Sequence, residues 1–328
     1  MKPTVKKIAE DLKLSQATVS KALAGRQEIS EETRGRVTKY AHEIGYLKSP
    51  AVRRRLGVLA VNPSDMDDSL SSLTFNLLMG FQQYASCLQQ DVVVIRANSN
   101  ELEQATLDLL AHAHQVDGLF VTGLKNTDPY YVQLETTTTP IVTMDIQSSN
   151  PLVGQVGTDS IAGGALAIKH LVELGHKKIG FVNGHKEAYI SQERLAGYFS
   201  ALQMNQIPYD PTLCFDGDFS MESGANAADY FVKTDATAIY FASDLMTLGA
   251  LRRFQALGVN LPQDFSIMGF DNLSICQGCS PTLTTIAQNP MAIGESACAV
   301  LHGLIQKIPI RHVRIEPRLV VRESTAKI

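Results

Sequence analysis

Three acidic residues occur at the ends of predicted strands, where an α/β protein commonly binds a ligand. Asp145, Asp244 and Asp271 each follow a short apolar run, rich in β-branched residues, that is typical of a buried strand. In open α/β sheets ligands lie beyond the carboxyl ends of the strands, so these carboxylates predict an acceptor-rich cleft. Asp244 precedes a helical segment, and a helix cap is favoured there. Contact with a ligand is favoured for Asp145 and Asp271.

A different chemistry is indicated near the N-terminus. Gln16, Ala17 and Lys21 lie on the outer side of a short amphipathic segment. In the major groove of DNA, Gln pairs with adenine, Lys pairs with guanine, and an Ala methyl packs on the thymine methyl. This set predicts base reading by a helix. The alternative is a small helical bundle with no role on DNA.

Three short helices are expected to position these residues. Thr4, Ser15 and Ser30 are suitable N-caps, and each precedes a segment with helically spaced apolar residues. Gly25 and Gly45 are suited to end the second and third helices. Three helices around one core, with a tight turn between the first two, form the helix-turn-helix arrangement.

The charge of the chain is unevenly distributed. Residues 1–56 carry a net charge of +7 and the other residues −11, which gives −4 in total. A basic end on an acidic body predicts that the N-terminal part binds a polyanion and the body does not. A solvated basic tail is the alternative, but the helical periodicity argues against it.

Beyond residue 56, strand-like runs alternate with helical segments. The expected strands are Gly57–Val61, Val92–Ile95, Leu119–Thr122, Ile141–Met144, Ile179–Val182, Ala238–Phe241 and Ser266–Phe270. One intervening helix is expected over Ile161–Leu174, capped by Asp159 and closed by Gly175. This alternation predicts an α/β fold with doubly wound parallel sheets.

Composition and motifs argue against several classes of protein. No apolar run approaches the roughly 18–20 residues of a membrane span, and the N-terminus lacks a signal peptide, so we expect a cytoplasmic protein. The five cysteines have no regular spacing; Cys276 and Cys279 could suggest redox or zinc chemistry but lack a partner pair. The chain has no P-loop, dinucleotide-binding glycine motif or nucleophile elbow. We therefore expect no enzyme activity, no cofactor and no metal.

The N-terminal motifs resemble those of a known family. Thr4-Val5-x-x-Ile8-Ala9 followed by Leu14-Ser15-x-x-Thr18-Val19-Ser20-x-x-Leu23 is similar to the head of the lactose/galactose repressor (LacI/GalR) family. The resemblance implies a DNA-binding domain over residues 1–46, with Thr18 and Ser20 either contacting phosphates or packing the helix. The implied DNA-binding residues are Thr4, Ser15, Gln16, Ala17, Thr18, Ser20, Lys21, Arg53, Arg54 and Arg55.

Residues 47–56 resemble the hinge of that family, which becomes helical on operator DNA and wedges a leucine into the minor groove. Ser49 and Pro50 would begin such a helix. Leu56 occupies the leucine position but runs directly into the strand-like segment Gly57–Val61. We therefore expect Leu56 to begin a strand instead of inserting into DNA, while the arginines before it contact phosphate or the minor groove by charge.

The resemblance extends over nearly the whole remaining chain. Its motifs are Asp159-x-x-x-Gly163, His170-Leu171-x-x-x-Gly175-His176, Arg194-Leu195-x-Gly197, Ser243-Asp244, Gly269-Phe270-Asp271-Asn272 and Pro281-x-Leu283-Thr284-Thr285-Ile286. They imply a core over residues 57–328 like that of periplasmic sugar-binding proteins, with two lobes, three crossovers and an effector in the cleft. The first lobe would contain 57–158 and 286–313, and the second 159–285 and 314–328.

The resemblance also implies an effector site. Its residues would be Asp145, Arg194, Phe219, Ser243, Asp271 and Gln288. An arginine fork, carboxylates and an aromatic face suit a sugar or glycoside, and a purine is the alternative. For Phe219, ordinary core packing also remains open.

Together these features predict a repressor that acts as a homodimer on double-stranded operator DNA and responds to a small effector. The C-terminus carries no heptads for a tetramer-forming coil. The rival classes are an α/β enzyme and a secreted sugar-binding protein. The missing catalytic motifs argue against the first, and the basic head and missing signal peptide argue against the second.

Overall fold

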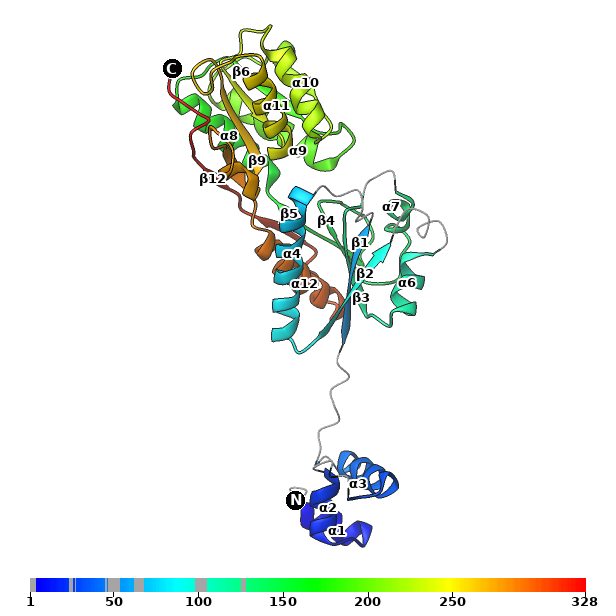
Figure 1. Ribbon diagram of the computed structural model, residues 1–328. Coiled ribbons are helices and arrows are strands. Elements are labelled where there is room, and N and C mark those ends of the chain that lie inside the picture. The colour runs from blue at the N-terminus through cyan, green and yellow to red at the C-terminus, as the bar shows by residue number, and fades with distance from the viewer. Residues whose placement is uncertain are drawn as a thin grey trace. The chain divides into compact units, whose positions relative to one another are not determined.

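The computed structural model describes residues 4–23, 26, 28–44, 46, 54–61, 68–97, 105–124 and 128–328, without the side chains of residues 42 and 68–72. The chain divides into two compact units, Met1–Arg54 and Arg55–Ile328 (Figure 1). Among the described helices, none is long and apolar enough to cross a lipid bilayer.

The first unit, which we call the head, contains three helices: α1 (Val5–Leu12), α2 (Gln16–Leu23) and α3 (Glu31–Glu43). The three expected N-caps are confirmed, because the side-chain oxygens of Thr4, Ser15 and Ser30 accept hydrogen bonds from backbone N–H groups one turn later. Gly25 and Gly45, the expected helix ends, lie outside the described residues. The small core is formed by Ile8, Ala9, Val19, Ala22, Val37 and Ala41.

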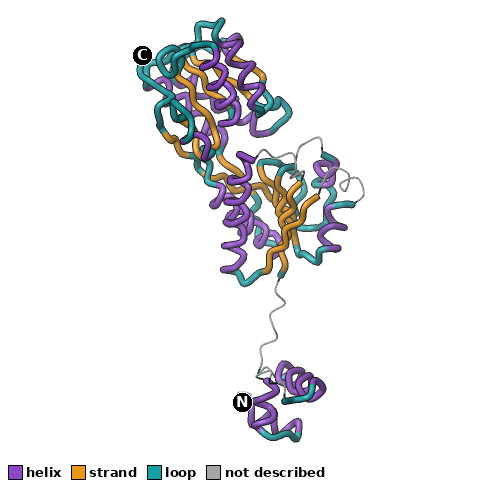
Figure 2. Tube along the Cα trace, in the orientation of Figure 1, coloured by secondary structure: helices purple, strands orange, loops and turns teal. Residues whose placement is uncertain are grey.

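The second unit, the core, contains one parallel and one mainly parallel sheet, each covered by helices (Figure 2). The first sheet has the order β11-β5-β4-β3-β1-β2 and is parallel throughout. Its strands are β1 (Arg55–Val61), β2 (Asp91–Ala97), β3 (Gly118–Thr122), β4 (Ile141–Met144), β5 (Val153–Thr158) and β11 (His312–Ile315). On one side α4 (Asp68–Cys87) packs against α12 (Pro290–Ile305), and α6 (Leu107–Ala113) and α7 (Pro129–Gln133) lie on the other (Figure 1).

The second sheet has the order β12-β10-β9-β8-β6-β7, in which β12 runs antiparallel to β10. Its strands are β6 (Ile179–Asn183), β7 (Cys214–Asp216), β8 (Ala238–Phe241), β9 (Ser266–Asp271), β10 (Thr284–Ala287) and β12 (Arg318–Val320). Two helix pairs cover it, α8 (Ser160–Glu173) with α9 (Tyr189–Met204) and α10 (Met221–Phe231) with α11 (Asp244–Ala256). Short 3-10 turns at Pro211–Leu213 and Ser274–Gln277 complete this lobe.

The chain passes between the two sheets three times, after β5, after β10 and after β11. The expected boundaries at 286 and 314 both fall inside strands. β10 continues in the second sheet to Ala287, which pairs with Asp271, and β11 continues in the first sheet to Ile315, which pairs with Thr158. The crossings therefore lie at 288–289 and at 316–317.

The hinge expected over residues 47–56 extends too far along the chain, because its last two residues belong to a strand of the core. β1 begins at Arg55, two residues before the expected strand, so Arg55 and Leu56 belong to the core. Leu56 is fully buried and pairs with Val92 on one side and Gly118 on the other. Leu56 therefore belongs to a core strand, as expected, although the strand begins one residue earlier; the side chain packs in the apolar core of the first lobe.

Candidate functional site

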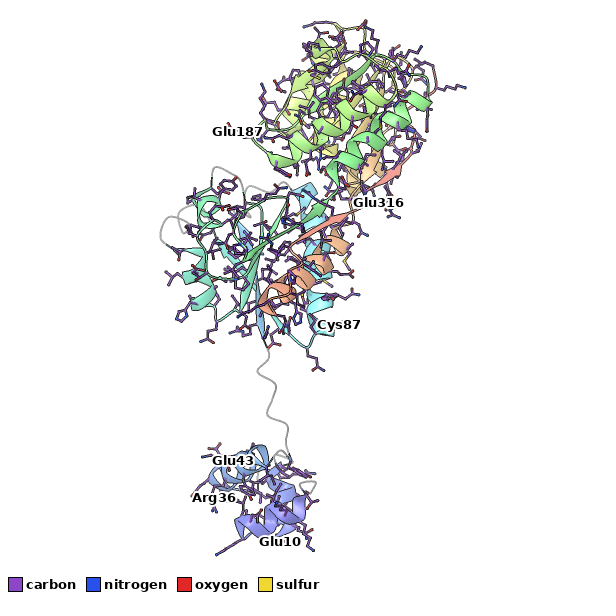
Figure 3. All side chains as sticks on the ribbon, turned by 180° about the vertical axis from the view of Figure 1, so that it is seen from behind. Glu10, Arg36, Glu43, Cys87, Glu187 and Glu316 are labelled. Carbon is purple, nitrogen blue, oxygen red and sulfur yellow. The ribbon has the colours of Figure 1, made fainter. Side chains whose placement is uncertain are left out.

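The head presents the expected base-reading residues at its surface. Gln16, Ala17, Ser20 and Lys21 are all exposed on α2, while Val19 and Ala22 of the same helix are buried. This alternation leaves one face of α2 free of the head's own packing. Side chains of the neighbouring helices, such as Glu10, Arg36 and Glu43, also project from the surface (Figure 3).

Four of the residues expected to bind DNA form polar contacts within the head. The hydroxyls of Ser15 and Thr18 lie 2.8 Å apart, and Ser15 Oγ also accepts the Thr18 backbone N–H, so both side chains serve the start of α2. Thr4 caps α1 in the same way. Lys21 forms an exposed ion pair with Glu28, which costs little to exchange for a phosphate or a base.

The three arginines expected to contact DNA are not equivalent. Arg53 lies outside the described residues, and Arg54 is the last residue of the first unit. Arg55 is in β1, where its backbone N–H donates to Asp117 at 2.9 Å and its guanidinium reaches Gln115 at 3.5 Å. Arg55 is therefore held by the core, which corrects its expected place in a flexible hinge.

The core contains a cavity of about 1040 Å³ whose lining residues come from both lobes. Tyr131, Asp145 and Gln147 contribute from the first lobe, and Tyr189 and Phe219 from the second. Of the six expected effector residues, Asp145 and Phe219 line this cavity. The other four are not among its lining residues.

Phe219 is placed by its backbone and by a glycine. Its φ of 69° is left-handed, and its ring lies over Gly184, where a Cβ would come within 1.9 Å of the ring. The His185 ring meets it edge-on with 6.1 Å between centroids. One aromatic face is thus held at the cavity, although Phe219 also packs against the second-lobe core.

Three expected residues form one buried network behind the cavity. Arg194 on α9 lies with its guanidinium carbon 3.7 Å from the Phe270 ring centroid, donates to the Ala242 carbonyl, and has a nitrogen 3.7 Å from the Asp271 carboxylate. Gln288 donates to Asp271 at 2.6 Å and accepts from Thr158 at 2.7 Å. Burial raises the pKa of Asp271, and the nearby Arg194 charge opposes that shift.

Asp145 is the least satisfied of these carboxylates. One of its oxygens is buried without a hydrogen-bond partner among the described residues, and the closest cation, Arg314, is 4.0 Å away. Burial raises the pKa of Asp145 to about 7, while the charges of Arg194 and Arg314 act in the opposite direction. This oxygen, Oδ1, is the one that lies over Gly157 and beside Arg314. The side chain as a whole is 19% exposed and lines the cavity, so a ligand would reach the carboxylate through its other oxygen.

The expected cap at Asp244 is wrong. Ser243 is the N-cap of α11, and its hydroxyl accepts the Met246 N–H at 3.2 Å. Asp244 is the first helical residue, and its buried carboxylate accepts from the Leu273 N–H at 2.8 Å and the Thr285 hydroxyl at 2.6 Å. Both residues therefore organise the second lobe, and the Ser243 side chain is 5% exposed.

Comparison with known proteins agrees with this architecture. Residues 4–49 match the model of the bacterial regulatory proteins of the lacI family, and residues 168–325 match that of the periplasmic binding protein-like domain. The repressor CytR of Escherichia coli (strain K12) is 32% identical over 335 residues, covering 98% of this chain and 96% of CytR. The chain belongs to the LacI family of bacterial transcription regulators.

Other members of the LacI family are similarly close. The repressor PurR of Aliivibrio salmonicida (strain LFI1238) is 30% identical over 99% of both chains. Among solved structures, a complex of the transcriptional regulator CelR with cellobiose has a TM-score of 0.73 at 27% identity, covering 98% of this chain and 100% of that one. A lac repressor dimer bound to operator and the anti-inducer ONPF has a TM-score of 0.72 at 25% identity, with 99% and 100% covered. Membership of the LacI family argues against the two rival classes, an enzyme and a secreted sugar-binding protein.

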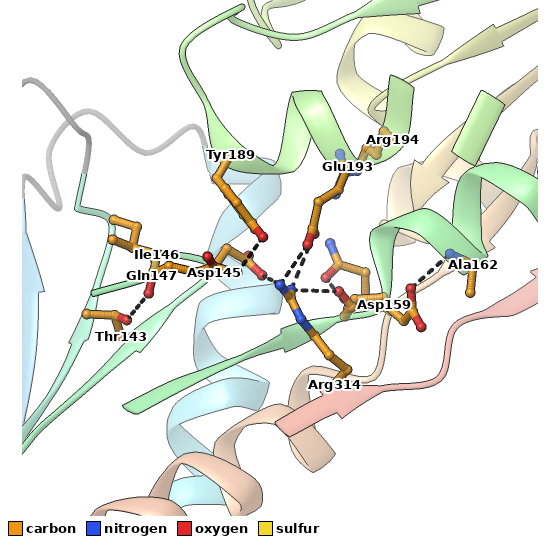
Figure 4. Close-up of polar contacts among 12 residues, drawn as sticks. Thr143, Asp145, Ile146, Gln147, Asp159, Ala162, Tyr189, Glu193, Arg194 and Arg314 are labelled. Atoms are coloured by element: carbon orange, nitrogen blue, oxygen red, sulfur yellow. Dashed lines mark hydrogen bonds and ion pairs between the residues drawn. The ribbon is translucent and has the colours of Figure 1, made fainter. Parts of the chain in front are cut away.

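Sequence reasoning missed a set of polar contacts that join the two lobes of this LacI-family core. Arg314 on β11 donates to Glu193 on α9 through two nitrogens, at 2.7 and 3.3 Å (Figure 4). Gln147 of the first lobe donates to the Tyr189 hydroxyl of the second. Among the described residues no group of His, Cys, Asp or Glu is arranged to hold a metal ion. Nothing in the local sequence around Arg314 pointed to Glu193, since 121 residues separate the two.

Proposed function

We propose that the chain is a cytoplasmic repressor that binds a near-palindromic operator as a homodimer and releases or tightens it in response to a sugar or glycoside in the cleft. The observation that supports this most directly is the pairing of an exposed α2 surface in a basic head with a large cavity between two α/β lobes. The lac repressor structure, a dimer on operator DNA, supports the assembly.

On DNA, we assign base reading to Gln16, Ala17 and Lys21, because these α2 residues are exposed. We assign phosphate contact to Ser20 and to the basic segment Arg53–Arg54. Thr4, Ser15, Thr18 and Arg55 have hydrogen bonds inside the protein, and their contribution would be to orient the head and the start of the core.

In the cleft, Phe219 would stack on the apolar face of a pyranose, and Asp145 would accept a hydrogen bond from a sugar hydroxyl. Arg194, Asp271 and Gln288 would stabilise the wall behind them through their network, and Ser243 would do so by capping α11. The CelR–cellobiose complex supports a carbohydrate as the ligand class.

The test is thermal unfolding of the full chain with a panel of cellobiose, ribose, other mono- and disaccharides, sugar phosphates and purines. A ligand bound only by the folded state stabilises it by about 2.7 kcal/mol at a hundredfold excess over its dissociation constant. Phe219→Leu, which keeps apolar volume and loses the aromatic face, should abolish a sugar-induced rise in melting temperature. Phe199→Leu is the matched control, since Phe199 stacks on Tyr209 away from the cavity lining.

Arg194→Ala is a poorer probe than the sequence suggested. The side chain is 3% exposed and bonded to Ala242, so its removal would lower the melting temperature without any ligand. A shift with purines alone would overturn the carbohydrate assignment and favour a purine effector, which the similarity to PurR keeps as the second candidate. A sugar-induced shift that survives Phe219→Leu would place the ligand elsewhere.

A further inference from the structure

Arg314 occupies a position between the two lobes. It projects from β11, one residue before the end of the strand, and pairs in register with Gly157 of β5. Its guanidinium donates hydrogen bonds to the Glu193 carboxylate of the second lobe at 2.7 and 3.3 Å, and to the Thr158 carbonyl at 3.4 Å. A two-point contact of this kind fixes the plane of the guanidinium.

The same guanidinium faces Asp145, as Figure 4 shows. The Asp145 carboxylate lies over Gly157, where a Cβ would come within 1.9 Å of its oxygen, so only glycine leaves room for it. Asp145 has a left-handed backbone, with φ of 60°. Backbone and neighbour therefore both direct this carboxylate toward Arg314 and the cavity, although the two groups stay 4.0 Å apart.

The charges around Asp145 do not balance. The groups that face it are Arg194 and Glu193 on α9, Asp271 at the end of β9, and Arg314 on β11. Three carboxylates share two guanidiniums. Arg314 pairs with Glu193 at 2.7 Å and Arg194 has a nitrogen 3.7 Å from Asp271, so Asp145 has no ion-pair partner closer than 4.0 Å among the described residues.

We propose that Arg314 is a positioning residue for the effector site. Held by Glu193 beside the buried oxygen of Asp145, it favours the ionised form of this carboxylate, so that the part of Asp145 exposed to the cavity takes a hydrogen-bond donor from an uncharged or cationic ligand and rejects an anion. This inference rests on the proposed function for its ligand. The effect of Arg314 on the ionisation of Asp145 concerns the protein alone and can be measured without a ligand.

The first experiment needs no ligand. Melting temperature is measured from pH 5 to pH 9 for the full chain, for Arg314→Gln and for Arg314→Lys, each alone and combined with Asp145→Asn. Subtracting the profile of each Asp145→Asn partner removes other titrating groups, such as His170 and His176, and leaves the titration of Asp145. Stability should fall as pH rises and then level off; the midpoint, defined as the pH at which the slope has dropped by half, should lie near the folded-state pKa of Asp145, about 7, in the parent protein.

Arg314→Gln should move that midpoint upward by about one unit or more, because an opposite charge nearby favours the ionised carboxylate. Arg314→Lys keeps the charge and should restore most of the midpoint. Arg311→Gln is the matched control, since Arg311 lies just before the same strand and donates only to the Asn150 carbonyl in its described contacts. An unmoved midpoint in Arg314→Gln, or an equal movement in Arg311→Gln, would overturn the proposal.

The second experiment uses cellobiose, ribose and their phosphorylated forms as probes at pH 8. The parent should respond to a neutral sugar more strongly than to its phosphate, and Arg314→Gln should lose at least tenfold in affinity for the neutral sugar. A preference for the phosphate would contradict the inference. If no sugar or phosphate binds the parent, the carbohydrate assignment fails while the ligand-free titration still decides the role of Arg314.

Discussion

The head and the core use their polar residues in opposite ways. On α2 of the head, the residues assigned to DNA are exposed and have at most one labile partner, such as Glu28 for Lys21. In the core, Arg194, Asp271 and Gln288 are tied to one another and to the strands that carry them. A surface that meets a polyanion needs charge and reach, whereas a cleft that selects a small molecule needs fixed geometry.

This difference predicts separate consequences of substitution. Changes on the outer face of α2 should weaken operator binding and leave core unfolding unchanged. Changes in the core network should lower the stability of the core, and any effect on ligand binding should follow from that loss of stability. The first variants below test whether operator binding and core stability can be changed separately. They lie at the boundary between the two units and at the ends of the sheet strands.

The largest effect is expected at the boundary. Leu56→Ala should lower the free energy of unfolding of the core by about 2–5 kcal/mol, because it empties a fully buried site in β1. Urea unfolding and the DNA bend angle would be measured together. An unchanged unfolding curve with a lost bend would assign Leu56 to the DNA-binding hinge and remove the boundary proposed between the units.

Asp244→Ala should cost about 2–4 kcal/mol of core stability. Two buried donors, the Leu273 N–H and the Thr285 hydroxyl, lose their acceptor, and each unmade bond costs about 1–3 kcal/mol. Asp244→Asn retains an acceptor oxygen and should cost less. Equal losses in the two variants by urea unfolding would mean that packing, not hydrogen bonding, sets the contribution of this residue.

Asp145 should make the stability of the core depend on pH. Its folded-state pKa is raised from 3.8 to about 7, so the folded state binds a proton more tightly than the unfolded chain. The stability linked to that proton is fully present below about pH 4 and is lost as pH rises through about 7. Asp145→Asn should remove this slope and stabilise the protein by about 1–3 kcal/mol at pH 8, the lower part of what a three-unit shift allows. A parent profile that is flat from pH 5 to pH 8 after subtraction of the variant would contradict the assignment.

The smallest effect is expected in the head. Lys21→Ala should weaken operator binding by about 1 kcal/mol per half-site and relax the preference at one base pair, with core unfolding unaltered. Binding to operator and to random DNA is compared at the same salt concentration. Equal losses on both would make Lys21 a phosphate contact instead of a base-reading residue.

Local signals in the sequence predicted much of this fold. The caps at Thr4, Ser15 and Ser30 could be predicted because a hydroxyl before an amphipathic run satisfies the first free N–H groups. Runs such as Ile141–Met144 and Ala238–Phe241 form strands over the expected residues. β5 was missed because its two glycines and Gln155 lack the composition of a strand, although every residue in it is buried.

The site could be predicted only in part. Asp145 directly follows β4 and Asp271 is the last residue of β9, and their place at the carboxyl ends of strands could be predicted from the alternating pattern. The ion pair between Arg314 and Glu193 joins residues far apart in the sequence, and the alternating segment around Arg314 reads as an ordinary edge strand. Ser243 takes the cap that was expected of Asp244, because α11 begins one residue earlier than the sequence pattern indicated.

Left-handed backbone at Asp145, Phe219 and Asp271 has a consequence for how this regulator could acquire a new ligand. Few side chains tolerate that conformation, with Asn, Asp and Gly the least penalised, so these positions accept a narrow set of replacements. Neighbours with ordinary backbone, such as Gln147 and Tyr189, are free of that restriction and also line the cavity. Directed evolution of effector choice should therefore accumulate its changes at Gln147 and Tyr189 and leave the strained positions as a fixed frame.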